Sequence, residues 1–140
     1  MAGFVGRYEH TLDDKGRVIL PAKFRASFER GGYLTENREG CLALWTPAEF
    51  ERQLATLHRT AAEGGRQGRN RARLWAAHSQ EVEIDKQGRM PISSYLRAFA
   101  QLDGDVLVHG AIDRIELWAP AKWDQLVAPD EQWFLEDDGE

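Results

Sequence analysis

Two copies of one short pattern constrain most strongly what this chain can fold into. The segment LDDKGR at 12–17 is matched by IDKQGR at 84–89, an offset of 72 residues. Further along, LALWTP at 42–47 is matched by IELWAP at 115–120, at an offset of 73 residues. Two blocks repeated in the same order with one residue of slip indicate an internal duplication. We expect a pseudo-symmetric molecule with two similar surfaces, which suits a partner that itself repeats.

The composition is typical of a globular domain with a hydrophobic core. Of 140 residues, 42% are hydrophobic and 29% are charged. Cys41 is the single cysteine, so no disulfide can form within the chain, which is typical of the reducing cytosol. The sequence has neither a signal-peptide pattern nor an apolar run near the roughly 20 residues of a membrane span. These features predict a cytoplasmic protein.

The charges are divided unevenly between the halves of the chain. The formal net charge is −5, but residues 1–74 hold 13 Lys/Arg and 9 Asp/Glu, whereas residues 75–140 hold 5 and 14. Binding responds to local potential, so a basic face on an acidic molecule is compatible with a nucleic-acid partner. An unevenly charged, solvated surface is the alternative that charge alone leaves open.

Local patterns predict the same order of elements twice, strand-turn-strand-helix-strand-strand-helix. In the first copy we expect strands at 7–12 and 18–20 around a turn at 13–16, a helix at 22–30, strands at 33–35 and 41–45, and a helix from Thr46-Pro47. In the second copy we expect strands at 82–84 and 89–92 around a turn at 85–88, a short helix carrying Leu96 and Phe99, strands at 106–108 and 115–118, and a helix from Pro120. The short strands joined by turns favour a mixed or antiparallel, barrel-like core with helices outside it.

The same patterns divide the chain into four segments. We expect a first repeat at 1–62, a linker and connecting helix at 63–80, a second repeat at 81–127, and an acidic, disordered tail at 128–140. The stretch 61–68 is Gly- and Ala-rich and polar and is expected to be a linker, and 69–78 is expected to be helical.

The block from Tyr8 to Arg17, with its second copy, resembles the MraZ family, two-repeat relatives of the AbrB/SpoVT-type transcription factors. That family carries an Asp-x-x-x-Arg motif in each repeat, here Asp13 with Arg17 and Asp85 with Arg89. The resemblance covers residues 3 to 127. It implies an α+β fold with a tandem-repeat double-ψ or swapped-hairpin β-barrel core and short flanking helices.

The resemblance also implies a function. A member of this family is expected to be a sequence-specific, DNA-binding transcriptional regulator, located in the cytoplasm at the nucleoid. Its expected partners are double-stranded DNA, as repeated promoter boxes of the division and cell-wall gene cluster, and further copies of itself in a ring. The alternative is an antitoxin-like protein-interaction module of the AbrB type, whose acidic half meets a basic protein.

The candidate site residues follow from the two motifs. An arginine fork suits phosphates and guanine edges, and a lysine adds a point charge for phosphate. Asp can close a turn and pair with the arginine, and Gly permits a positive φ. A purely structural Asp–Arg clamp, with no contact to DNA, is the alternative for each motif. The predicted DNA-binding residues are Lys15, Arg17, Lys86, Arg89, Lys23 and Arg7, and the predicted turn or clamp residues are Asp13, Gly16, Asp85 and Gly88.

The two repeats are not equivalent in sequence. Pro91 falls where the first copy has Ile19, and a proline inside a strand is tolerated mainly at an edge or a bulge. We therefore expect the first repeat to contribute more to DNA contact. Arg25 is expected to flank the DNA surface with Arg7, or else, because Arg97 is its counterpart, to have a role at an interface or at the edge of the core.

Other chemistries find little support in the sequence. The four histidines lack metal-ligand spacing, and neither a nucleophile elbow nor a phosphate-binding glycine loop is present. We predict no enzyme activity, no metal and no cofactor. The arginines at 66, 69, 71 and 73 could follow phosphates non-specifically, but a solvated helix face explains them better.

Overall fold

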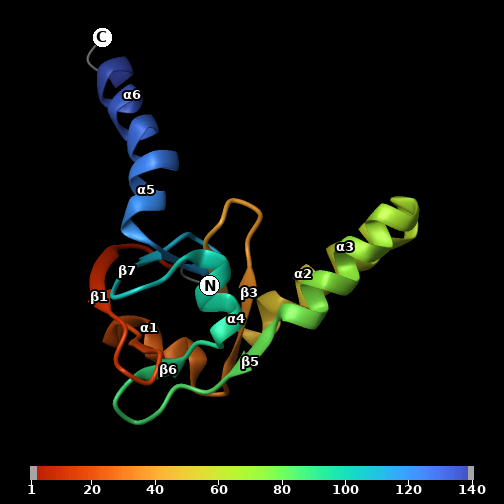
Figure 1. The fold of residues 1–140 in the computed structure, drawn as a ribbon, viewed down its shortest axis with the longest axis horizontal. Coiled ribbons are helices and arrows are strands. Elements are labelled where there is room, and N and C mark those ends of the chain that lie inside the picture. The colour runs from red at the N-terminus through yellow and green to blue at the C-terminus, as the bar shows by residue number, and fades with distance from the viewer. Residues whose placement is uncertain (1–2, 139–140) are drawn as a thin grey trace.

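The fold is built from short antiparallel strands and helices, and the computed structural model describes residues 3–138 (Figure 1). The first half contains β1 (Arg7–Thr11), β2 (Arg17–Ile19), α1 (Ala22–Arg25), the 3-10 helix η1 (Ala26–Phe28), β3 (Gly32–Glu36), β4 (Leu42–Trp45), α2 (Pro47–Glu63) and α3 (Gly65–His78). The second half contains β5 (Gln80–Val82), β6 (Arg89–Pro91), α4 (Ser94–Ala100), β7 (Asp105–Gly110), β8 (Ile115–Trp118), α5 (Pro120–Leu126) and α6 (Ala128–Asp138).

The strands pair across the halves of the chain in a symmetric order. A six-stranded sheet has the order β1-β7-β8-β4-β3-β5, and a separate two-stranded ribbon joins β2 to β6. Every pair is antiparallel. The repeat counterparts are β1 and β5, β3 and β7, and β4 and β8. If each strand is exchanged for its counterpart, the same sheet order is obtained, read from the other edge. The duplication is therefore a pseudo-two-fold whose axis passes between β4 and β8.

Each half completes the sheet of the other. β1 lies beside β7, and β5 lies beside β3, so the strand before each motif pairs with the opposite hairpin. The α+β class with antiparallel strands is confirmed. Between the sheet edges β1 and β5, the part of the chain that the structure describes shows no strand pairing that would close a barrel.

One continuous core joins the two halves. Residues from both repeats are almost fully buried in it, including Val18, Leu34, Met90, Leu96 and Leu117. Because units of about 65 residues are marginally stable alone, this shared core explains how both halves fold. Among the described residues, no helix is long and apolar enough to cross a membrane.

The Gly-rich segment at 61–68 is helical on both sides of a break at Gly64, which differs from the expected linker. α2 and α3 form an antiparallel helical hairpin that projects from the body (Figure 1). At Gly68 a Cβ would lie 2.6 Å from the carbonyl oxygen of Thr60, so the absent side chain lets the helices approach closely. The glycines therefore serve the packing of the hairpin rather than a flexible connection.

The C-terminal segment and the first helix also differ from expectation. α6 occupies 128–138, where a disordered tail is predicted, and residues 139–140 lie outside the described part of the chain. Pro129 suits the first turn of a helix, and Asp130 and Glu131 favour its positive end. The predicted helix at 22–30 is shorter, because α1 tightens into η1 and the chain turns at Gly31.

Candidate nucleic-acid interface

Asp13 closes the first motif into a tight loop. One carboxylate oxygen, Oδ1, accepts the backbone N–H groups of Lys15 and Arg17, both at 2.9 Å. The other oxygen, Oδ2, accepts the Nε–H of Arg17 at 2.8 Å. The carboxylate therefore fixes both the course of the loop and the direction of the arginine.

Asp85 repeats this geometry in the second motif. It accepts the backbone N–H groups of Gln87 and Arg89, both at 2.9 Å, and the Nε–H of Arg89 at 2.7 Å. In each loop the backbone N–H of the motif arginine does most to hold the pKa of the aspartate below its ordinary value of 3.8, and this outweighs the opposing effect of burial. Both aspartates are therefore ionised at neutral pH.

An arginine from the opposite half packs against the glycine of each motif loop. Gly16 and Gly88 have φ angles of +73° and +84°, which favour glycine. A Cβ at Gly16 would overlap the guanidinium of Arg97, and a Cβ at Gly88 would overlap that of Arg25. Arg97 and Arg25 therefore pack reciprocally against the two loops, a placement that the sequence leaves undecided.

The two motif arginines lie on the same face of the β2–β6 ribbon. Val18 pairs with Met90, and both side chains are buried under the ribbon. Arg17 pairs with Pro91, and Ile19 pairs with Arg89, so these four residues occupy the opposite, outward face. Pro91 lies at the edge that a proline requires, since the ribbon has only two strands.

The guanidinium ends of both arginines stay available on this face. The aspartates engage only Nε, and within residues 3–138 the terminal nitrogens of Arg17 and Arg89 donate to no protein group. The arginine side chains are 25% and 35% exposed. Each guanidinium is thus held through its Nε atom, while its two terminal nitrogens remain free to donate to a partner.

The loop tips add two lysines, and the ribbon edge adds acidic groups. Lys15 and Lys86 are exposed beside the motif arginines. A shallow cavity of about 720 Å³ next to the ribbon is lined by both motif arginines and by Glu81 and Glu83. These carboxylates lower the positive potential of the face, so a single ribbon offers an anionic partner only a few favourable contacts.

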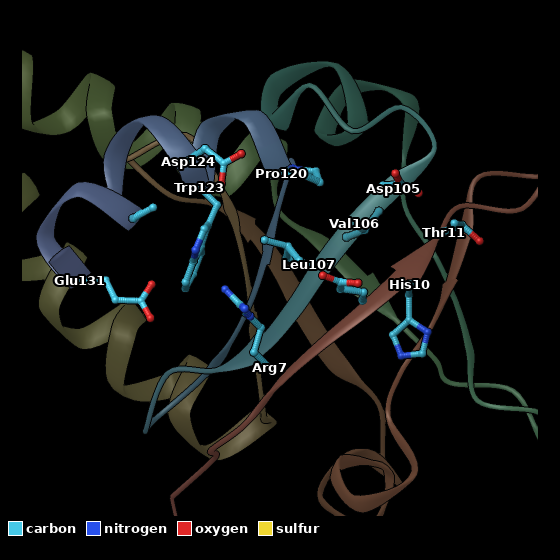
Figure 2. Close-up of a pocket in the computed structure, with 12 residues that line it drawn as sticks. Arg7, His10, Thr11, Asp105, Val106, Leu107, Pro120, Trp123, Asp124 and Glu131 are labelled. Atoms are coloured by element: carbon cyan, nitrogen blue, oxygen red, sulfur yellow. The ribbon is translucent and has the colours of Figure 1, made fainter. Parts of the chain in front are cut away.

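Two predicted DNA-binding residues belong to neither the ribbon nor its loops, since Lys23 lies on α1 and Arg7 on β1. The ammonium of Lys23 lies 5.4 Å from the ring centre of Tyr8 and 5.3 Å from that of Phe24. Arg7, at the far end of β1 from the loop, lies 5.5 Å from the ring centre of Trp123 on α5 (Figure 2). The structure therefore brings together Lys15, Arg17, Lys86 and Arg89 but not Lys23 and Arg7.

A buried cluster of ionised side chains is present in the second half and has no counterpart in the first half. Glu116 on β8 accepts hydrogen bonds from His109 and Trp118, both at 3.0 Å, and pairs with Arg114. Burial alone would raise the pKa of Glu116, but these donors and the charge of Arg114 outweigh it and lower the pKa to about 2. Its partner across the pseudo-axis is Ala43, so the cluster belongs to the second half alone.

Within the described part of the chain, no cluster of three or more His, Cys, Asp or Glu side chains has a metal-binding arrangement. The groups that the candidate interface offers a partner are the guanidinium groups of the motif arginines and the ammonium groups of the loop lysines.

Comparison with known proteins assigns the family. The family model described as "MraZ protein, putative antitoxin-like" matches residues 4–69 and again 75–138. The chain belongs to the MraZ family. The two matches coincide with the two halves of the pseudo-symmetric fold, and the second includes α6, which lies beyond the end of the resemblance expected from the sequence.

Curated MraZ proteins resemble the chain over nearly its whole length. "Transcriptional regulator MraZ" of a Nocardioides species is 39% identical over 133 residues, covering 95% of this chain and 92% of the relative. The protein of that name from Kocuria rhizophila is 40% identical over 137 residues, covering 98% and 95%. That from Caldanaerobacter subterraneus is 39% identical over 124 residues, covering 86% and 84%. The predicted family is thereby confirmed, and these relatives are named as regulators, not as enzymes.

Proposed function

We propose that this MraZ chain is a non-enzymatic transcriptional regulator that reads DNA with the outward face of the β2–β6 ribbon. The observation that carries the proposal is the pairing of two Asp-clamped arginines, Arg17 and Arg89, on that single face. The names of its relatives support the regulatory role.

The dimensions of DNA fit such a ribbon. The major groove of B-DNA admits a two-stranded β-ribbon, and an arginine fork donates two hydrogen bonds to the O6 and N7 atoms of guanine. Arg17 and Arg89 come from equivalent positions related by the pseudo-two-fold. The ribbon therefore presents two similar readers, while Lys15 and Lys86 at the loop tips supply phosphate contacts.

Repetition of the DNA site would compensate for the small size of each ribbon. Several copies assembled in a ring would bind repeated promoter boxes with a high effective concentration, so that weak single contacts add up. We extend the proposal to the repeated boxes of the division and cell-wall gene cluster, and to a cytoplasmic, nucleoid-associated location. Both extensions rest on the family resemblance.

A second function is favoured by one finding. The family description includes the words "antitoxin-like", and the second half of the chain is acidic. A protein-interaction module would meet a basic protein through those carboxylates. It would show no affinity for promoter DNA, and this difference separates the two proposals.

The test is a gel-shift assay with DNA from upstream of the gene that encodes the chain. Each bidentate base contact contributes about 1–3 kcal/mol, so we expect Arg17→Ala and Arg89→Ala each to weaken binding by roughly 5- to 150-fold. Arg38→Ala, which removes an exposed arginine from the β3–β4 turn, should bind as the wild type does. Circular dichroism should show an intact fold in all three variants.

The contrary results are distinct. Unchanged affinity of both ribbon variants would refute the ribbon as the reader. An absence of DNA binding by the wild type would refute DNA recognition and favour the interaction module.

A further inference from the structure

Within residues 3–138, the second half of the molecule lacks the helix that covers its counterpart in the first half. By the repeat offset, α2 corresponds to α5 followed by α6, and Phe50 corresponds to Trp123. α3 packs along α2 and β3, where Trp75 stacks on Phe50 with ring centres 5.4 Å apart. No helix of residues 3–138 packs in this way on α5, α6 and β7.

A groove lies in the corresponding place. It has a volume of about 630 Å³ and is bounded by β1, β7, α5 and α6 (Figure 2). Trp123 and Arg7 project into it in the close-up, and edge-to-face contacts with His109 and Trp118, at 5.0 and 5.8 Å, hold the Trp123 ring. The groove is therefore shaped by fixed side chains.

The rim of the groove is acidic. Glu9 on β1, Asp105 on β7, Asp124 on α5 and Glu131 on α6 are all exposed there, against the single guanidinium of Arg7 and the imidazole of His10. Charges on four different elements converge on one opening. Such a site attracts a cationic partner, and attraction between exposed charges weakens as salt is added.

α3 carries the complementary face. It contains four arginines and no acidic residue. Arg66, Arg69 and Arg73 are exposed and spaced by three and four residues, which places them on the side opposite Trp75 and away from α2. The side of α3 that its own chain leaves uncovered is thus a basic stripe.

We propose that the groove binds α3 of a second copy of this chain. The inference rests on the proposed assembly of several copies and identifies the surface that would make it. The chain's own α3 is held against α2 and projects from the body in a different direction from α5 and α6, so the partner must be another molecule (Figure 1). The incoming helix would cover the groove as α3 covers α2, with arginines against the acidic rim.

The contact is directional. α3 belongs to the first half and the groove to the second, so each chain has one donor and one acceptor surface that differ from each other. A contact of this kind is heterologous and generates rings or open chains rather than two-fold dimers.

The experiment uses paired charge reversals and sedimentation velocity without DNA. Arg69→Glu with Arg73→Glu disables the donor, and Asp124→Lys with Glu131→Lys disables the acceptor. We expect each double variant to raise the dissociation constant of self-association at least tenfold and to sediment as a monomer where the wild type is oligomeric. Matched reversals off the surfaces, Arg30→Glu with Arg38→Glu and Glu29→Lys with Glu39→Lys, should assemble as the wild type does.

A mixing experiment excludes simple misfolding as the cause. In a 1:1 mixture of the two variants, the intact α3 meets the intact groove and the acidic α3 meets the basic groove, so the mixture should regain the assembly that each variant alone has lost. A mixture that remains monomeric would overturn the proposal, as would variants that assemble like the wild type. A wild type that is itself monomeric would refute the assembly of copies altogether. Because these measurements contain no DNA, none of their outcomes tests DNA binding through Arg17.

Discussion

At the scale of single residues, one carboxylate in each motif both closes the loop and orients the motif arginine. Asp13 satisfies two backbone N–H groups and fixes the guanidinium of Arg17, and Asp85 does the same for Arg89. This part of the site is predictable from sequence, because all its partners lie within four residues. An Asp-to-Arg spacing across a Gly-containing turn is enough to indicate it.

The support that Arg97 and Arg25 give to the loops is not predictable in this way. Arg97 meets Gly16 across 81 positions of the sequence, and Arg25 meets Gly88 across 63. Only the exchange of strands between the halves brings them together. The equivalence of the two arginines is visible in the sequence, but their target is not.

Gly16→Ala tests this support. A residue with a Cβ costs about 1–2 kcal/mol at a left-handed φ, and here the Cβ must also displace Arg97. Gly104→Ala is the control, since Gly104 has a φ of +80° and a Cβ there would meet no atom within 4 Å. By urea denaturation, we expect Gly16→Ala to reduce the free energy of unfolding by about 1 kcal/mol more than Gly104→Ala. Equal losses would show that Arg97 contributes nothing to the loop.

At the scale of elements, order and type follow from the sequence but pairing does not. The two strand-turn-strand-helix patterns correspond to β1 to α1 and β5 to α4, because alternation and turn residues are local signals. The pairing of β1 with β7 and of β5 with β3 depends on the packing of the whole core. The α2–α3 hairpin is not predictable from local signals, because glycines that usually break helices provide close helix packing at Gly68.

Phe50 connects that hairpin to the sheet. Its ring stacks on Tyr33 at 3.9 Å and on Trp75 at 5.4 Å. Aromatic pairs contribute about 0.5–1.5 kcal/mol each beyond the burial of area, so Phe50→Ala should destabilise the hairpin by roughly 2–3 kcal/mol. Hydrogen exchange should accelerate in α2 and α3 and stay unchanged in the β2–β6 ribbon.

Leu54→Ala, one turn further along α2 at a side chain that is 43% exposed, is the matched control and should leave both regions protected. Faster exchange in the ribbon of Phe50→Ala would mean that the hairpin and the ribbon unfold as one unit, contrary to this expectation.

At the scale of the whole molecule, the duplication gives one chain two kinds of surface. The strand exchange merges the motifs into a single ribbon that is nearly symmetric. The charged helices differ, since α3 carries four arginines while α5 and α6 border an acidic groove. The ribbon proposed to bind DNA is thus nearly symmetric between the halves. The uneven charge of the sequence lies instead on the two surfaces proposed for assembly, a basic α3 in the first half and an acidic groove in the second.

The central claim is that loops from both halves contact DNA together, and the salt dependence of binding tests it most directly. Each phosphate contact contributes about 0.9 to the slope of log K against log salt concentration on B-DNA. Fluorescence anisotropy over a salt series should therefore give a slope smaller by about 1 per bound chain for Lys15→Gln, by about 1 for Lys86→Gln, and by about 2 for the double variant. A double variant whose slope equals that of the wild type would contradict the claim.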